Sequence, residues 1–175
     1  SPPSTGIGSV EARRMMALFE RYPRLGERLP HAALASLPTP VQRVERLGEH
    51  VGHGGLYVKR DDVSARPYGG NKARKLEFLL GEAVRQGARE VLTFGCAGSN
   101  HATATAVYAR QLGLRSISIL LPQPNAHTVR RNLLLSFRNG AELHHYANGR
   151  LAALGTVWQL ARHRLKTGRK PLVIP

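Results

Sequence analysis

Apolar stretches and amphipathic stretches alternate along the second half of the chain, and this alternation restricts the fold more than any other feature. The apolar stretches are short and bounded by glycine or by turn residues, which is typical of buried strands. We expect strands at residues 90–95, 116–121, 141–146 and 172–174, and helices at 102–112, 128–137 and 151–165. Strands and helices that alternate at this spacing predict a parallel α/β sheet with right-handed crossovers.

The helical spacing also predicts which side chains face the core. A further helix is expected over residues 71–86, ahead of the first of these strands. In the helix that follows the second strand, we expect Leu133, Leu134 and Phe137 to point inward. Cys96 directly follows a strand, and we interpret it as a small buried residue rather than a reactive thiol.

The first part of the chain carries weaker signals. We expect a short helix over residues 10–22 with Ser9 as its cap, and loop structure over 23–38. Two prolines in the segment 37–44 favour an extended backbone there. A short strand is expected within residues 55–62, where an apolar stretch runs into charged residues.

The charged run at the end of that strand is Lys59-Arg60-Asp61-Asp62. Lys59, Arg60 and Asp62 either pair with one another and hold the following loop, or form a solvated cluster that contributes little to stability. The sequence leaves both interpretations open.

The chain is strongly basic, with 26 lysines and arginines against 11 aspartates and glutamates and a formal net charge of +15. Such an excess raises nucleic acid as a partner. The basic residues are spread along the chain, aromatic residues are sparse, and no signature of a nucleic-acid-binding fold is evident, so we expect no nucleic acid. The alternative function is a basic α/β module that binds anionic ligands or nucleic acid without catalysis.

The cysteine content and the apolar runs bear on the cellular compartment. A single cysteine excludes an internal disulfide framework and fits a reducing compartment, so we expect a cytoplasmic protein. No apolar run approaches about 18 residues, so we expect no membrane-spanning segment. The first residues lack the basic-then-apolar layout of a secretory signal.

The segment GGNKARKLEF contains the first candidate functional residue, Lys72. Two glycines and an asparagine lead into a helix, so Lys72 lies at or near the first helical turn. The helix dipole and the neighbouring Arg74 and Lys75 disfavour a further positive charge there. A lysine amine that is partly neutral near pH 7 attacks carbonyl groups and forms a Schiff base. The alternative is a simple turn followed by a solvated lysine.

A second candidate lies in the turn Gly98-Ser99-Asn100-His101, which leaves a strand and enters a helix. Parallel α/β proteins bind ligands at this position, beyond the carboxyl ends of the strands. The free N–H groups at the helix start bind anions, while the three side chains offer a hydroxyl, an amide and an imidazole. Ordinary capping of the helix by Ser99 or Asn100 is the alternative.

Both segments resemble those of one enzyme family. GGNKARKLEF is similar to the lysine segment of the fold-type II pyridoxal-phosphate (PLP) enzymes of the 1-aminocyclopropane-1-carboxylate (ACC) deaminase and D-cysteine desulfhydrase family. The resemblance implies that Lys72 carries PLP as a Schiff base and then acts as a catalytic base. It also implies that Asn71 contacts the cofactor. Lys75 follows Lys72 by one helical turn, so it either reaches the cofactor phosphate or is a surface lysine.

The turn at residues 98–101 follows the lysine helix at about the interval seen in that family. The resemblance implies a catalytic role for Ser99, as nucleophile or acid/base group, and a bond from Asn100 to the hydroxyl of the PLP ring. It further implies that Ser99, Asn100 and His101 bind the substrate. His101 replaces the more usual glutamine, which argues against a strict ACC deaminase.

The resemblance covers roughly residues 37–175 and implies an architecture. The fold would be the three-layer, tryptophan synthase β-like α/β sandwich of fold-type II enzymes, with its C-terminal half absent. Residues 1–74 would belong to the large PLP-binding domain, 75–172 would form the small domain, and 173–175 would begin the return to the large domain. The full-length enzyme would be a homodimer that converts D-cysteine or ACC to a 2-oxo acid and ammonia, with sulfide released from cysteine. No metal is implied.

Overall fold

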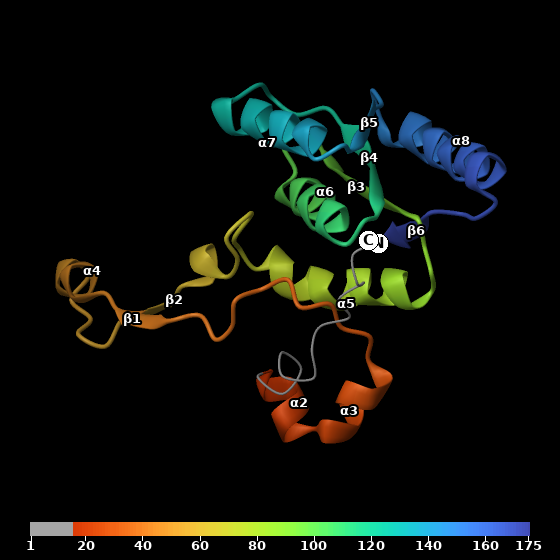
Figure 1. Cartoon of the computed structure of the whole chain (residues 1–175). Coiled ribbons are helices and arrows are strands. Elements are labelled where there is room, and N and C mark those ends of the chain that lie inside the picture. Colours follow the sequence, from red (N-terminus) through yellow and green to blue (C-terminus); the bar gives the residue numbers. More distant parts are fainter. Residues whose placement is uncertain (1–15) are drawn as a thin grey trace.

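The computed structural model describes residues 16–175, and its centre is a four-stranded parallel sheet with the order β5-β4-β3-β6 (Figure 1). The strands are β3 (Glu90–Cys96), β4 (Arg115–Leu121), β5 (Glu142–His145) and β6 (Leu172–Ile174). The helices around them are α5 (Lys72–Arg85), α6 (Asn100–Gln111), α7 (His127–Arg138) and α8 (Gly149–Thr167). The prediction of alternating strands and helices in a parallel α/β sheet is therefore confirmed.

The strand order reverses at β3. The chain adds β4 and β5 on one side of β3 and then returns to place β6 on the other side. In open α/β sheets, ligands bind beyond the carboxyl ends of the strands at such a reversal. The turn at residues 97–99, between β3 and α6, lies at this position.

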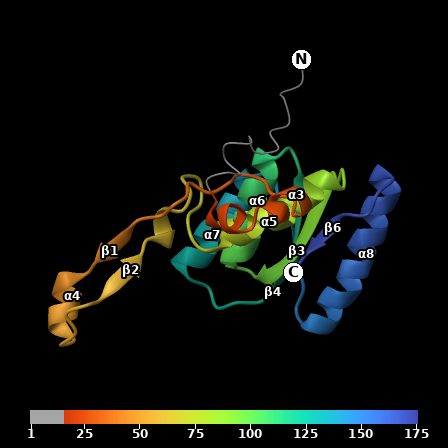
Figure 2. The ribbon, with the colours of Figure 1, turned by 90° about the horizontal axis from the view of Figure 1, so that it is seen from below.

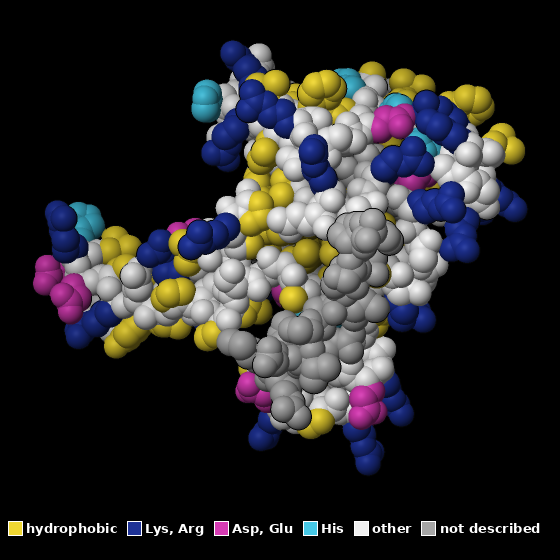
Figure 3. Space-filling model, viewed as in Figure 1, with side chains coloured by type: hydrophobic (Ala, Val, Ile, Leu, Met, Phe, Trp, Pro, Cys, Tyr) yellow, Lys and Arg dark blue, Asp and Glu magenta, His cyan; other side chains and the backbone are white. Residues whose placement is uncertain are grey.

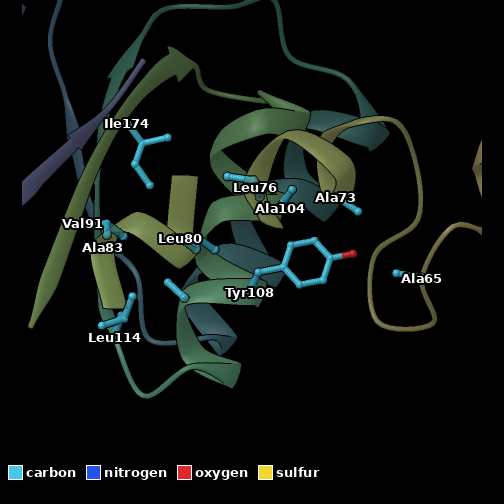
Figure 4. Packing of buried hydrophobic residues seen from close by; sticks show 11 residues of the cluster. Ala65, Ala73, Leu76, Leu80, Ala83, Val91, Ala104, Tyr108, Leu114 and Ile174 are labelled. Atoms are coloured by element: carbon cyan, nitrogen blue, oxygen red, sulfur yellow. The ribbon is translucent and has the colours of Figure 1, made fainter. Parts of the chain in front are cut away.

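Helices cover both faces of the sheet, which gives three layers. Helices α5 and α6 pack on one face through a cluster centred on Leu76, Leu80 and Tyr108, all fully buried (Figure 4). Helix α8 covers the other face, where Leu92, Ile117 and Ile119 form a second cluster. Figure 2 shows α8 separated from α5 by the strands. The three-layer fold class expected from the sequence is confirmed.

Charged groups are buried beneath α8, and they are paired. Glu90 and His163 are each 2% exposed, and a Glu90 carboxylate oxygen lies 2.9 Å from His163 Nδ1. Arg115 reaches the same carboxylate at 2.6 Å, and Glu142 lies 3.4 Å from His163 Nε2. Because an unpaired buried charge is costly, these contacts allow α8 to cover the end of the sheet at which β3 and β5 each begin with a glutamate.

A buried glutamate on α5 holds the segment that precedes the first strand. Glu77 is 1% exposed, and one of its carboxylate oxygens accepts hydrogen bonds from the backbone N–H groups of Leu34 and Ala35 at 3.0 and 2.9 Å. The Glu77 carbonyl accepts from the N–H of Ala32. These bonds satisfy one oxygen of the buried carboxylate, whose other oxygen lies 3.4 Å from His31 Nε2, and they fix the N-terminal segment against α5.

The N-terminal region contains more helix than expected. Helix α2 (Ala17–Arg21) falls within the helix predicted for residues 10–22, whose first part and Ser9 cap lie outside the described residues. Helix α3 (Pro23–Arg28) occupies the first part of the segment 23–38, for which a loop was expected. The loop prediction was wrong there, because proline at the first helical position lacks only an N–H that would be unpaired anyway.

A two-stranded antiparallel ribbon projects from the rest of the molecule (Figures 1 and 2). It consists of β1 (Val41–Arg43), the helix α4 (Glu45–His50) and β2 (Tyr57–Lys59), and it leads into a 3-10 turn, η1 (Asp61–Val63). All six strand residues are exposed. The ribbon therefore contributes little to the core, and it precedes the loop that leads into α5.

Two predictions about burial were wrong. In α7, Leu134 and Phe137 are 58% and 71% exposed, and the helix instead buries Val129, Asn132 and Ser136 against α6. The two buried polar side chains are hydrogen-bonded there, so this face is stable without a fully apolar stripe. Cys96 is exposed rather than buried, because it points to the α8 side at the end of β3, where Phe94 is also exposed.

Candidate active site

The loop before α5 depends on two glycines. A Cβ atom on Gly69 would lie 1.9 Å from the carbonyl oxygen of Asp62, so no larger residue fits without moving the loop. Gly70 has φ +112°, a conformation that other residues rarely adopt. Lys72 follows as the first residue of α5, as the sequence predicts.

Polar contacts hold this loop in place. The Ser64 hydroxyl accepts from Gly70 N at 3.0 Å and donates to Gly70 O at 2.9 Å, while Gly70 N also donates to Asp61 O at 2.8 Å. Arg74 on α5 donates to the Asp61 carboxylate at 2.8 Å. That bond keeps the pKa of Asp61 below its usual value. These contacts close the loop through its own residues and connect it to α5, the helix that follows it.

Charge pairing within the run at residues 59–62 is confirmed in part. Arg60 donates two hydrogen bonds to Asp62, from Nε at 2.8 Å and from a terminal nitrogen at 2.7 Å. Lys59 does not join this pair, because its amine donates to the carbonyl oxygen of Thr39. The contact between Asp61 and Arg74 was missed, since the sequence gives no sign that these residues are adjacent in space.

The turn before α6 is built around a helix cap. Ser99 Oγ accepts from the backbone N–H of Ala102 at 3.2 Å, which is the capping that the sequence offered as an alternative to a functional role. Gly95 allows this position, because a Cβ there would lie 2.4 Å from Ser99 Cβ. Capping fixes the Ser99 side chain at the mouth of the turn and leaves its hydroxyl hydrogen free to donate elsewhere.

Side chains from two other elements hold Asn100. Its Oδ1 accepts from Tyr68 Oη in the glycine loop and from Asn132 Nδ2 on α7, both at 2.8 Å. Asn132 Nδ2 also donates to the carbonyl of Gly98 at 2.9 Å. Tyr68 is in turn fixed by Tyr108, whose hydroxyl donates to the Tyr68 carbonyl at 2.5 Å. Sequence reasoning missed Tyr68 and Asn132, because neither lies in a recognised motif.

The two turns border one open cleft of about 800 Å³. Its lining combines the glycine loop, the start of α6 and the exposed side of α7, and comprises Asp62, Tyr68, Gly69, Gly70, Asn71, Lys72, Asn100, Arg131 and Leu135. The structure therefore brings Asn71, Lys72 and Asn100, three of the predicted site residues, into a shared cleft. Arg131 adds a positive charge that the sequence did not single out.

His101 and Lys75 lie beside this cleft, near the end of β6. Lys75 Nζ donates to the carbonyl of Pro175 at 2.7 Å. Burial, together with the positive charges of Lys75 and Lys72, lowers the pKa of His101 below 6.5. His101 is therefore neutral near pH 7, so one ring nitrogen donates and the other accepts.

The donor set of the cleft fits PLP. Lys72 supplies a primary amine for an aldehyde, and Asn100, which lines the same cleft from the other turn, supplies an amide as partner for a ring hydroxyl. The cleft is large enough for a cofactor of this size.

Between residues 16 and 175 the helices are too short or too polar to span a lipid bilayer. Lys and Arg side chains are scattered around the face shown in Figure 3 rather than gathered in one stripe.

Comparison with known proteins agrees with this geometry. Residues 33–175 match the family described as pyridoxal-phosphate dependent enzyme. A protein of Pyrococcus abyssi, named provisionally as an ACC deaminase, is 38% identical over 160 residues, which are 91% of this chain and 45% of that protein. D-cysteine desulfhydrase of Salmonella paratyphi B is 44% identical over 93 residues, which are 53% of this chain and 28% of that protein.

Two further similarities concern function and fold. The nocardicin C-9′ epimerase of Nocardia uniformis is 43% identical over 121 residues, which are 69% of this chain and 36% of that protein. A crystal structure of an ACC deaminase homologue superposes with a TM-score of 0.72 at 35% identity, over 87% of this chain and 46% of that one.

The match to the family covers most of the chain, and the superposition shows that the similarity holds for the three-dimensional structure as well. The chain spans about half the length of the first curated relatives that it matches. Its cofactor, expected from the sequence as PLP, is that of the family. The chain belongs to the pyridoxal-phosphate-dependent enzymes, alongside proteins named ACC deaminase and D-cysteine desulfhydrase.

Proposed function

We propose that the full-length protein is a PLP-dependent lyase or deaminase that acts on a small amino acid. D-cysteine or ACC is converted to a 2-oxo acid and ammonia, and cysteine also yields sulfide. The observation that carries this proposal is the single cleft that Lys72 and Asn100 both line. The names of the relatives support the substrate class.

Each candidate residue has a role that matches its chemistry. When bound, PLP supplies the electron sink of the reaction. Lys72 binds it covalently and then moves a proton as the free amine, while Asn100 orients the ring through its amide. The Ser99 hydroxyl donates or accepts a proton at the substrate, and the neutral His101 ring donates an N–H to the substrate carboxylate. Asn71 and Lys75 complete the cofactor site from the start of α5.

An epimerase is the second candidate function, and one relative favours it. The chain is 43% identical to an epimerase over 121 residues. Epimerisation and elimination from cysteine both begin with removal of a proton from the carbon next to the amino group, and Lys72 is positioned on the cleft for either reaction. Residues outside this chain would then decide whether the proton returns or a leaving group departs.

The test uses this chain extended to the length of its relatives. PLP-loaded protein is incubated with D-cysteine, L-cysteine and ACC, and the 2-oxo acid, ammonia and sulfide are quantified. The proposal expects a 2-oxo acid and ammonia from D-cysteine or ACC. Interconversion of cysteine enantiomers without ammonia would favour the epimerase. A colourless protein whose affinity for nucleic acid falls steeply with salt would favour the non-catalytic binding module.

The remaining expectations concern the whole protein. We propose the domain division of residues 1–74, 75–172 and 173–175, a homodimeric assembly and a cytoplasmic location. Helix α5 begins at Lys72 and runs across the first boundary, so a hinge between domains would lie in the glycine loop rather than at residue 74. Size-exclusion chromatography with light scattering on the full-length protein tests the assembly, and a monomer would contradict it.

A further inference from the structure

The orientation of the Asn100 amide is fixed by its surroundings. An asparagine side chain can present either an acceptor oxygen or a donor N–H₂ group, and its neighbours decide which. The Gly98 carbonyl can only accept, so Asn132 must turn its N–H₂ group toward it, at 2.9 Å. The same Nδ2 lies 2.8 Å from Asn100, and the Asn100 atom that it reaches is therefore the oxygen.

Tyr68 supplies a second donor to that oxygen, 2.8 Å away. Burial raises the pKa of the Tyr68 phenol, and burial likewise raises the pKa of Tyr108 to about 12. Both phenols therefore keep their protons at neutral pH. Tyr108, fully buried in the core, fixes the Tyr68 backbone, so the hydroxyl of Tyr68 is held in position from the core of the molecule.

The Asn100 oxygen thus accepts two hydrogen bonds, which use both of its lone pairs. The side of Asn100 that remains available on the cleft is the Nδ2 amide with its two hydrogens. We propose that Tyr68 and Asn132 are positioning residues that commit Asn100 to donate, so that the cleft selects an oxygen acceptor on the cofactor ring at this point. This inference rests on the proposed function, in which the cofactor ring lies against Asn100.

Tyr68 and Asn132 together form a clamp on the Asn100 amide. This clamp matters because an unrestrained amide turns by 180° at little cost. The turned amide would direct Oδ1 at a ring oxygen, and two acceptors repel. Asn132 is only 2% exposed and sits on α7, whereas Tyr68 belongs to the glycine loop. The clamp therefore joins the Lys72 loop, the α6 turn and α7, and it couples the position of the amine to the orientation of the amide.

The experiment compares two clamp variants with two matched controls in the full-length protein. Tyr68→Phe removes only a hydroxyl, and Asn132→Leu removes the amide at similar volume. Ser136→Ala is the control for α7, because Ser136 is similarly buried against α6 and bonds to Thr103 and to the backbone carbonyl of Asn132, not to Asn100. Tyr22→Phe is the control for loss of an exposed phenol hydroxyl. The readouts are the dissociation constant for PLP and the pH dependence of its visible absorption.

We expect PLP affinity to fall about fivefold in Tyr68→Phe and about tenfold in Asn132→Leu. In the double variant the affinity for PLP should fall by less than the product of the two single-variant factors, since both residues hold the same Asn100 oxygen. The pH at the midpoint of the change in visible absorption should rise in both variants. The Asn100 N–H donor favours the deprotonated ring oxygen, and the variants weaken that donor. The two controls should match the wild type in affinity and spectrum.

The outcomes separate this inference from the proposed function. A wild-type protein that carries a reducible PLP adduct on Lys72, with clamp variants of unchanged affinity and spectrum, would overturn the clamp alone. A fall in affinity that Ser136→Ala shares equally would also overturn it, since packing rather than orientation would be responsible. A wild type without any adduct on Lys72 would overturn the proposed function and the clamp together.

Discussion

The two turns that border the cleft are built in different ways. The turn before α5 depends on backbone shape, since Gly69 has no room for a Cβ atom and Gly70 has φ +112°. The turn before α6 depends on side-chain hydrogen bonds, with Ser99 capping the helix and Asn100 held by its oxygen. A substitution in the first turn therefore changes where the lysine lies, and one in the second changes which groups face it.

The largest expected effect comes from removing the amine that the first turn presents. Lys72→Ala should abolish the visible absorption of bound PLP and reduce activity by at least about 10²–10⁴-fold, the usual contribution of a catalytic base. The free energy of unfolding without cofactor should change by less than about 1 kcal/mol, since the Lys72 side chain is only partly buried. Lys166→Ala, on the exposed side of α8, controls for the loss of one charge. A visible band in Lys72→Ala would contradict the assignment.

Backbone shape in the first turn is tested by Gly69→Ala. The new methyl group would lie 1.9 Å from the Asp62 carbonyl oxygen, so the loop must move. We expect a loss of about 2 kcal/mol or more in the free energy of unfolding, measured by urea denaturation, together with weaker PLP binding. Gly54→Ala is the matched control, because nothing lies within 4 Å of a Cβ there. Equal stability of the two variants would refute the steric account.

The second turn is tested by separating capping from chemistry at Ser99. Ser99→Ala should lose about 1 kcal/mol through the missing cap. Asn148→Ala removes the equivalent cap of α8, where Asn148 Oδ1 accepts from Leu151 N at 3.0 Å, and should lose a similar amount. If Ser99 acts on the substrate, kcat falls in Ser99→Ala alone. Parallel losses of stability with unchanged kcat in both variants would leave Ser99 as a cap only.

The smallest effect concerns the charge environment that both turns create around His101. Its pKa is lowered from 6.5, so between that value and the folded-state pKa the unfolded chain binds more protons than the folded one. Stability from this residue is thus present above 6.5 and is lost as the pH falls. His101→Gln should show a smaller loss of unfolding free energy between about pH 7 and about pH 5.5. A steeper loss in the variant would show that the sign is wrong.

The fold could be predicted because its signals are local. Strands such as the one ending at Gly95 are short, apolar and bounded by glycine, and a helix such as α5 carries an apolar stripe that includes Leu76 and Leu80. The orientation of α7 could not be predicted, because its inward face carries Asn132 and Ser136. Polar side chains face inward only where a specific partner receives them, and that partner, α6, is known only from the tertiary structure.

The residues of the candidate site likewise fall into those that the sequence predicts and those known only from the tertiary structure. Lys72 and Asn100 stand in short motifs whose residue types suggest their chemistry, so the sequence predicts both as site residues, and the structure places both on one cleft. Tyr68 and Asn132 escaped notice, since each is a single residue whose contact is 32 positions away along the chain. The glycine pair before Lys72 predicted a turn but not why glycine is needed there. The structure gives the reason, which is the close approach of Gly69 to the Asp62 backbone.

The central claim is that the amine of Lys72 holds the cofactor in the cleft that it shares with Asn100. Borohydride reduction of the PLP-loaded full-length protein, followed by peptide mapping, tests it most directly. We predict a single pyridoxyl group on the peptide that contains Lys72. A label on Lys75 or another lysine, or no label on a protein that binds PLP, would contradict it.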